Sequence, residues 1–283
     1  VVSPDAMLST FDDILRVLTL GLAGIAAISL LVAGILVMNV TLMSVKQRTA
    51  EIGLLKAVGA PAAQVRTLFL TEAAAITTVG ALLGMLAGLK YDSDGNARRV
   101  GLVFYDSHGD FNTPETTLSG MLGGMPVAVA AGHALHNLRK TTGLTEPLPM
   151  GHIMWGGVRD LDPLEADRFR EYEVRQVSVQ DIRDINDNFR RQFQALADEV
   201  DVVYVHVDMD VLEPDEVPGH GLAVPDGPSS KALGAAIGVM FENPKTVALG
   251  IASTPSFNAD PDGRSRHAAL NLIEGALKGA QSR

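Results

Sequence analysis

The sequence contains no cysteine among its 283 residues. Disulfide frameworks, zinc–thiolate sites and cysteine nucleophiles are therefore excluded. Basic residues are also scarce, because 23 lysines and arginines stand against 33 aspartates and glutamates and leave a formal net charge of −10. This balance argues against nucleic acid as a partner, since no basic stripe is present to meet the phosphates. An acidic chain fits a divalent-cation site, and it fits many soluble enzymes equally well.

Charged residues are absent from 17–45, a stretch of 29 positions rich in Gly, Ala, Leu and Ile. About 20 apolar residues span a bilayer core, so this stretch predicts a transmembrane helix in contact with membrane lipid. A second apolar stretch, 73–89, has 17 residues and is marginal as a span. A buried helix of a soluble domain would have the same composition. Lysine and arginine outnumber acidic residues in the connection 46–66, which predicts that this connection is cytoplasmic.

Residues 44–73 read SVKQRTAEIGLLKAVGAPAAQVRTLFLTEA, with apolar side chains at helical spacing. A plain amphipathic surface helix has the same periodicity. The string resembles the C-terminal region of MacB/FtsX-like ABC transporter permeases, over about 18–83. In that family the helix between two spans couples to a partner ATPase, and the resemblance implies this role here for Arg48, Glu51, Gly53 and Lys56. Residues 1–89 are thus predicted to be a permease-like membrane fragment with one or two transmembrane helices.

From residue 90 onward, short β-rich runs alternate with helical patterns. Patterns typical of strands lie at 100–105, 153–158, 202–207 and 246–251. Helical patterns lie at 125–137, 181–199, 230–241 and 265–279. This alternation predicts an α/β domain with a parallel sheet over 90–283. Ligands of such sheets sit beyond the carboxyl ends of the strands.

Two of the apolar runs close on alternating metal-ligand side chains. Asp106, His108 and Asp110 follow the first run, and Asp208 and Asp210 end another. Residues i, i+2 and i+4 of an extended chain share one face, so each set can point together at the same edge of the sheet. Four carboxylates and one imidazole favour a hard or borderline ion such as Mn²⁺. The pattern therefore predicts a two-metal centre that activates water for attack on an electrophilic carbon.

Four motifs around these residues resemble the arginase/agmatinase ureohydrolase family over about 84–279. They are DSHGDFNTPE at 106–115, SG at 119–120, GVRDLDPLE at 157–165 and VDMDVLEP at 207–214. The resemblance implies a three-layer parallel α/β fold that lacks its N-terminal part here. It also implies hydrolysis of linear guanidino or amidino compounds at a binuclear manganese centre, and it suggests a homo-oligomer.

The same resemblance implies roles for single metal ligands. Asp106 and Asp208 would bridge the two ions. His108 and Asp210 would bind one of the ions, and Asp110 would bind the other.

Further roles concern the substrate and the proton transfers. Asn112, Ser119 and Asp162 would line the substrate entrance. Asp110 and His133 are the candidate catalytic residues, with His133 as a nearby substitute for a proton-carrying histidine that the family often has at the position of Gly123.

Two more positions depart from the family pattern. The family carries Gly-Gly-Asp followed by His or Cys about one helix before the Asp-x-His motif, and the equivalent region 70–83 has neither. The ion of Asp110 would therefore lose a ligand. The family glutamate that binds the guanidinium aligns near Ser253. Without this carboxylate a cationic amidine loses its charge partner, which predicts a different substrate or weak activity. Other side chains are expected to have packing or surface roles, namely His152, His206, His220, His267 and Trp155.

Three functional hypotheses remain open on the sequence. The first is a manganese-dependent ureohydrolase. The second is a membrane permease component of an ABC transporter with a passenger C-terminal half, and the third is a metal-binding domain without turnover. The chain is predicted to lie in the bacterial inner membrane if residues 1–89 are genuine, and in the cytoplasm otherwise.

Overall fold

The computed structural model describes Pro61, residues 79–255 and residues 259–283. Backbone contacts divide the chain into two units, Val1–Ala73 and Ala74–Arg283, and apart from Pro61 the described residues belong to the second. The predicted span 17–45 lies outside the described residues, and so does the permease-like connection 46–66 apart from Pro61. Within the described ranges, no helix is both long enough and apolar enough to cross a membrane.

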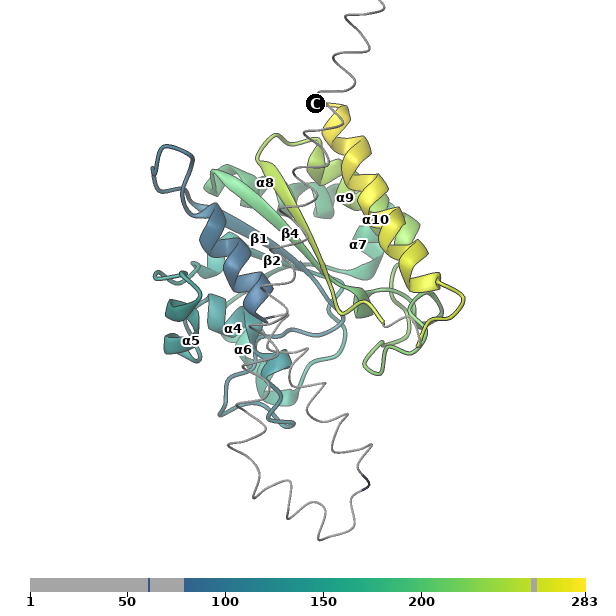
Figure 1. The fold of residues 1–283 in the computed structure, drawn as a ribbon, viewed down its shortest axis with the longest axis horizontal. Helices are drawn as coiled ribbons and strands as arrows, with labels where there is room; N and C mark the ends of the chain where they lie inside the picture. The colour runs from purple at the N-terminus through teal and green to yellow at the C-terminus, as the bar shows by residue number, and fades with distance from the viewer. Residues whose placement is uncertain (1–60, 62–78, 256–258) are drawn as a thin grey trace, which may run out of the picture. The chain divides into compact units, whose positions relative to one another are not determined.

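A parallel sheet of five strands, in the order β3-β2-β1-β4-β5, forms the centre of the second unit (Figure 1). The strands are β1 (Val100–Tyr105), β2 (Ile153–Gly156), β3 (Arg175–Val177), β4 (Val202–Asp208) and β5 (Thr246–Ala252). β1 and β4 pair in continuous register from Val100 opposite Val202 to Tyr105 opposite Val207. Their carboxyl ends therefore finish level with each other.

Every residue of β1 and β4 is buried, as expected for parallel strands covered on both faces. Successive side chains of a strand point to opposite faces. Leu102 and Phe104 accordingly join one hydrophobic cluster, while Val103 and Tyr105 join another. The two cores lie on opposite faces of the same sheet.

Helices cover both faces and complete three layers. One face carries helical residues 79–89 with α4 (Pro126–Ala130), α5 (His136–Thr141) and α6 (Pro163–Glu171). The other carries α7 (Val179–Asp184), α8 (Asp187–Glu199), α9 (Ser230–Phe241) and α10 (Arg264–Gln281). Single 3-10 turns lie at η1 (Leu122–Gly124), η2 (Met150–His152), η3 (Met209–Val211) and η4 (Pro214–Glu216). The predicted parallel α/β architecture is confirmed.

The described part of the stretch 73–89 packs inside the α/β unit. Val79, Leu82, Leu83 and Leu86 recur at helical spacing, are at most 1% exposed, and belong to the cluster that contains Leu102 and Phe104. These are the contacts of a buried helix, which was the alternative to a second span. The boundary predicted at residue 89 stays a prediction.

Two predicted helices are each divided in the structure. The pattern 181–199 forms α7 and α8, because Ile185 takes a left-handed φ of 47° and the side chain of Asn186 accepts a hydrogen bond from the Phe189 N–H at the start of α8. The pattern 125–137 separates into α4 and the beginning of α5, with Leu135 at φ 41°. The three-residue strand β3 and the polar helix α6 were not predicted.

α9 and α10 approach each other closely through glycines. A Cβ added at Gly275 would overlap the carbonyl oxygen of Gly234, and neither backbone can move away easily. We predict that Gly275→Ala lowers the free energy of unfolding by about 1–3 kcal/mol, as overpacking does in other cores. The shift of the urea midpoint measures it.

The matched control is Gly84→Ala, on helical residues 79–89, where an added methyl has nothing within 4 Å. Alanine favours a helix over glycine by about 1 kcal/mol, so this control should not destabilise the protein. Equal urea midpoints for the two variants would contradict the close helix packing.

Candidate metal centre

The carboxyl ends of β1 and β4 lie where the winding of the sheet reverses. The chain first adds β2 and β3 on one side of β1, and later adds β4 and β5 on the other. Ligands of open α/β sheets bind in the crevice at such a reversal. Asp106 follows β1 directly and Asp208 is the last residue of β4. The register therefore places the two predicted ligand sets side by side.

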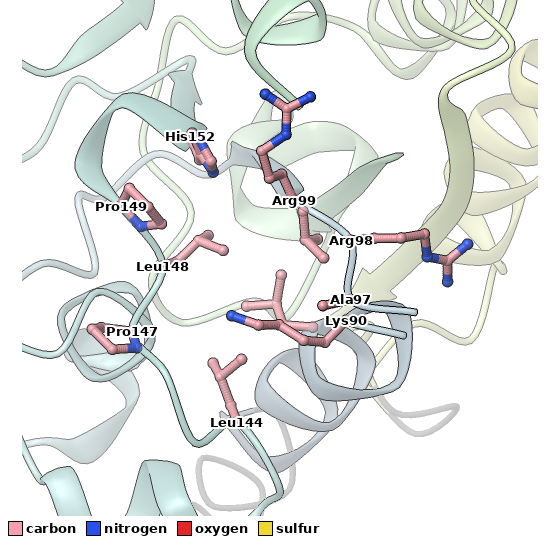
Figure 2. A pocket seen from close by; sticks show the side chains of 11 residues that line it. Lys90, Ala97, Arg98, Arg99, Leu144, Pro147, Leu148, Pro149 and His152 are labelled. Atoms are coloured by element: carbon pink, nitrogen blue, oxygen red, sulfur yellow. The ribbon is translucent and has the colours of Figure 1, made fainter. Parts of the chain in front are cut away.

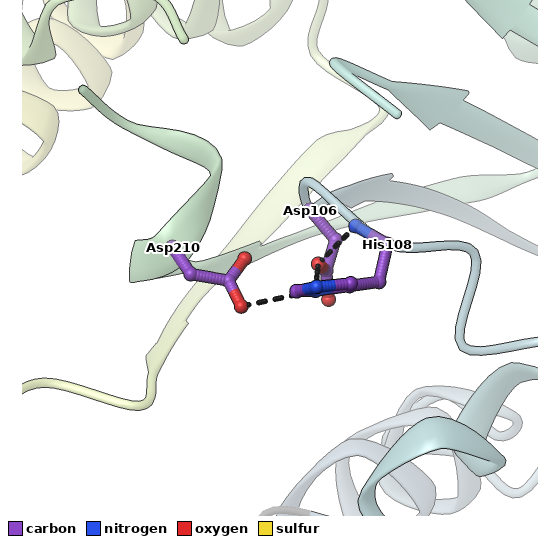
Figure 3. A group of neighbouring side chains, drawn as sticks. All are labelled: Asp106, His108 and Asp210. Atoms are coloured by element: carbon purple, nitrogen blue, oxygen red, sulfur yellow. Dashed lines mark hydrogen bonds and ion pairs between the residues drawn. The ribbon is translucent and has the colours of Figure 1, made fainter. Parts of the chain in front are cut away.

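Asp106, His108 and Asp210 form the first group of ligand atoms (Figure 3). His108 Nδ1 lies 3.2 Å from Asp106 Oδ1 and 3.1 Å from Asp210 Oδ2. The His108 N–H donates to Asp106 Oδ1 at 2.7 Å, which turns the chain directly after β1. The Ser107 hydroxyl donates to Asp210 Oδ1 at 3.0 Å and ties the two loops together.

Asp208, Asp210 and His220 form a second group, in which one ligand atom from each residue lies within 4.8 Å of the others. His220 Nε2 is 3.8 Å from Asp208 Oδ1. The expectation of a packing or surface role for His220 is therefore incomplete, because its ring faces the carboxylates. No motif marked His220. The only signal in the sequence was its place ten residues after Asp210, in the loop that leaves the same strand end.

Asp110 lies beside these groups in an unusual backbone conformation, with φ at 48°. Burial, followed by the charges of Asp208 and Asp210, raises the pKa of Asp110 well above its ordinary value. A side-chain hydrogen bond with Asp106 opposes this shift. Its carboxyl thus shares the electrostatic environment of the two groups without belonging to either set of three.

The carboxyl groups of the cluster repel one another in a buried setting. Burial and the neighbouring acidic groups raise the pKa of Asp106 well above its ordinary value, and burial together with Asp210 raises the pKa of Asp208 to about 7. Asp210 behaves differently. Burial favours a higher pKa, but hydrogen bonds with His108 and Asp106 and the charges of His108 and His220 together outweigh burial and lower the pKa of Asp210. For His108, burial favours a lower pKa, but the hydrogen bond with Asp210 and the charges of Asp210, Asp160 and Asp208 together outweigh burial and raise its pKa.

One imidazolium cannot balance four neighbouring carboxylates. A divalent cation among them would remove the repulsion and favour the ionised carboxylates, because a bound cation is the largest local charge in such a site. Oxygen and imidazole donors suit Mn²⁺ and similar ions. The donor set and its electrostatics therefore fit a divalent metal centre.

Arg159 joins the loops around the cluster. Its guanidinium donates to the carbonyl of Val224 at 2.7 Å, to that of Pro225 at 2.9 Å and to that of Asp210 at 3.4 Å. The loop that carries His220 is thereby tied to the segment that carries Asp210. The sequence motif contained Arg159 but gave it no role.

Two of the three predicted substrate residues touch each other. Asn112 Nδ2 donates to Asp162 Oδ2 at 3.1 Å, and Asp162 also begins α6 as its N-cap. Ser119 is exposed on the adjoining loop, whose Leu118 N–H lies 3.4 Å from Asp162 Oδ2. The structure thus gathers these polar groups on one loop and one helix start, and their contact with substrate stays a prediction.

His133 packs among aromatic rings. Its ring lies edge-on to Phe111 at 5.3 Å and to Tyr172 at 4.7 Å between centroids. Burial, and then the charge of Arg168, lower the pKa of His133. It belongs to neither ligand group, and a role in proton transfer stays a prediction.

Ser253 forms a hydrogen bond with a carboxylate of the cluster. Its hydroxyl donates to Asp208 Oδ2, and its backbone takes a left-handed φ of 58°. At the position near which the family has a glutamate, this chain therefore supplies a short hydroxyl that is already engaged.

Two expectations of plain packing agree with the structure. Trp155 is fully buried and donates its indole N–H to the Gly109 carbonyl at 2.8 Å, between His108 and Asp110. His206 is buried, stacks on Phe104 and contacts the Tyr204 hydroxyl at 2.9 Å. Burial lowers the pKa of His206 to about 4, so the ring is neutral near pH 7.

A cavity of about 260 Å³ lies at the other end of the sheet, around Val100 at the start of β1 (Figure 2). Arg98 and Arg99 line it, but Arg98 donates to the Tyr91 carbonyl and Arg99 pairs with Asp201 at 2.7 Å. This cavity is remote in the fold from the carboxylate cluster and does not serve it.

Comparison with known proteins decides the family. Residues 77–278 match the arginase family, and residues 23–93 match the C-terminal region of FtsX-like permeases. The chain belongs to the arginase family. It also carries an FtsX-like permease segment and is a fusion of both, as the sequence motifs predicted.

Curated relatives exist for each part. Arginase from Bacillus caldovelox is 31% identical over 147 residues, which cover 51% of this chain and 48% of that protein. A macrolide export ATP-binding/permease protein, MacB 1/2 from Paracoccus denitrificans, is 39% identical over 166 residues, 59% of this chain and 21% of that protein. The chain spans about half the length of the curated arginases it matches.

Solved arginases share the fold. The structure of Bacillus caldovelox arginase matches with a TM-score of 0.61 at 26% identity, over 71% of this chain and 66% of that one. Entamoeba histolytica arginase, solved in complex with L-ornithine, matches with a TM-score of 0.60 at 23% identity, over 73% of this chain and 76% of that one. The second likeness concerns the fold alone.

A cation that fits the cluster should stabilise the protein. We predict that Mn²⁺ at about 100 times its dissociation constant raises the free energy of unfolding by about 2.7 kcal/mol, seen as a higher melting temperature. Asp210→Asn should lose most of this rise, because Asp210 belongs to both ligand groups. Asp94→Asn, in an exposed turn before β1, is the matched control and should keep the full rise. An unchanged melting temperature for the natural sequence would contradict the fit.

Proposed function

We propose that the arginase-family part of the chain is a metal-dependent hydrolase that cleaves a C–N bond of a linear guanidino or amidino compound at a binuclear manganese centre. The observation that carries the proposal is the meeting of Asp106, His108, Asp110, Asp208 and Asp210 at the level ends of β1 and β4. Family membership supports the reaction class.

Each ligand has a proposed role in this centre. Asp106 and Asp208 would bridge two ions, His108 and Asp210 would hold one of them, and Asp110 would hold the other. Two such ions, when bound, supply a nucleophile at neutral pH because they lower the pKa of water.

Proton transfer is proposed for the carboxyl of Asp110. Asp110 is buried beside the two ligand groups, and an ionised carboxylate there could accept a proton from a water at the metal centre. It would take a proton from the attacking water and return it to the departing nitrogen. His133 would exchange protons between the site and solvent.

Substrate recognition would come from the loop that follows the first ligand set. Asn112, Ser119 and Asp162 offer hydrogen bonds to a polar group distant from the amidine carbon. Ser253 offers the amidine no negative charge, and its hydroxyl is engaged with Asp208. The proposed substrate is therefore a linear amidine other than L-arginine or agmatine, or else turnover is weak.

Release of ammonia, amine or urea from a panel of linear amidines, with Mn-loaded protein, tests this function. We predict turnover of at least one compound and a loss of at least about 100-fold for Asp210→Asn, since loss of even an outer-shell partner costs up to about 100-fold. Asp94→Asn should keep full activity.

Failure would take two forms. Hydrolysis of L-arginine or agmatine at rates usual for arginases would contradict the altered substrate. A protein with two bound ions and no turnover of any amidine would contradict the hydrolase itself.

A second candidate function rests on the permease match at 23–93. In this hypothesis the chain is a membrane permease component of an ABC transporter, its C-terminal half binds metal without turnover, and residues 17–45 contact the lipid of the bacterial inner membrane. The helical residues 79–89 pack in the core of the α/β unit instead. A cytoplasmic location is the alternative prediction. A homo-oligomer also stays a prediction.

Membrane fractionation followed by affinity capture tests the permease hypothesis. We predict that a partner ATPase is captured with the natural sequence and is lost with Glu51→Arg, which reverses charge in the predicted coupling helix. Glu146→Arg, at an exposed residue of the α/β unit, should still capture it. A chain found outside the membrane fraction and without an ATPase would contradict this hypothesis.

A further inference from the structure

The imidazole of His220 lies beside the carboxylate cluster, and His220 belongs to none of the family motifs. His220 Nε2 is 3.8 Å from Asp208 Oδ1, and its side chain is only 11% exposed. The family motif that would provide a further histidine has no counterpart in residues 70–83. The structure therefore offers a histidine ligand on the loop that carries His220, while the sequence has no histidine in residues 70–83.

The loop before His220 has little freedom to place the ring elsewhere. Gly219 has φ at 80°, and a Cβ there would lie 2.8 Å from the Ala259 carbonyl oxygen. The His220 N–H donates to the Val217 carbonyl at 3.1 Å. Together with the Arg159 bridge, these contacts hold the ring against the cluster.

The His220 ring is oriented with Nε2 toward the carboxylates. Nδ1 faces the Leu222 N–H at 3.4 Å, which is a long contact for a hydrogen bond. A cation at Nε2 requires the ring proton on Nδ1, so binding would replace this long contact. The ring also interacts with the backbone of Ser253.

We propose that His220 is the imidazole ligand of a second divalent cation, which shares Asp210 with the cation held by Asp106 and His108. Each cation then has one imidazole, and Asp210 lies between them, since it belongs to both ligand groups. This inference rests on the metal centre of the proposed function and changes its ligand set in two respects. His220 joins Asp208 at the second ion, and Asp210, which the proposed function gives to one ion, is shared by both.

The first test counts ions in the full-length chain. Elemental analysis after Mn²⁺ loading and desalting should find two ions per chain in the natural sequence and one in His220→Asn. Fluorescence of Trp155, the only tryptophan, reports occupancy because its indole bonds to Gly109 in the ligand loop. We expect a 10- to 100-fold loss of affinity for the second ion, and no change with His267→Asn, which alters an exposed histidine of α10.

A second variant tests coordination directly. The sequence has no cysteine, so His220→Cys introduces the sole thiol, and thiolates bind soft metals strongly. Cd²⁺ should then produce a thiolate-to-metal charge-transfer absorption at one equivalent. Cd²⁺ should produce none with His267→Cys, because residue 267 is exposed in the first turn of α10 and belongs to neither ligand group.

The outcomes separate this inference from the proposed function. Two ions in both the natural sequence and His220→Asn, with no charge-transfer band in His220→Cys, would overturn the role of His220 and leave the hydrolase standing. One ion in both proteins would overturn the second cation. No ion in the natural sequence would overturn the metal centre and this inference together.

Discussion

The register between β1 and β4 is the constraint on which the site depends. Tyr105 lies opposite Val207, so the next residue of each strand, Asp106 and Asp208, leaves the sheet at the same height. A slip of one residue would turn one ligand set toward the opposite face. The register is well specified, because both strands are buried on both faces and any slip would also exchange side chains between the two cores.

The same arrangement costs free energy that other contacts offset. Carboxylates are costly to bury and repel each other, and burial followed by the neighbouring negative charges raises the pKa values of Asp106 and Asp208. Hydroxyl donors at Ser107 and Ser253 and the imidazole of His108 contact the carboxylate oxygens. Rigid supports are needed to hold like charges together, and the Arg159 bridge is one of them. Pre-organisation of this kind is what a metal site requires of its surrounding shell.

Much of this arrangement was readable from the sequence, and the failures have physical causes. The apolar runs at 100–105 and 202–207 became β1 and β4 because continuous burial leaves a clear pattern. The strand β3 was missed because three residues, two of them polar, carry no periodicity. The break at Ile185 was missed because a left-handed φ in an isoleucine has no sequence signal. His220 was missed for another reason, since its contact with Asp208 depends on how a long loop folds back, and spacing along the chain does not show that.

The departures from the arginase pattern meet on one side of the cluster. Ser253 contacts Asp208 there, and His220 lies against both Asp208 and the Ser253 backbone. A long carboxylate beside Ser253 would compete with the His220 ring for the same space and would add a further negative charge to a cluster already rich in them. A hydroxyl at 253 and an imidazole at 220 are therefore mutually compatible choices. Neither residue adds a negative charge on the side of the cluster where the arginase pattern has a glutamate, so the carboxylates of that side come from the metal-ligand set alone.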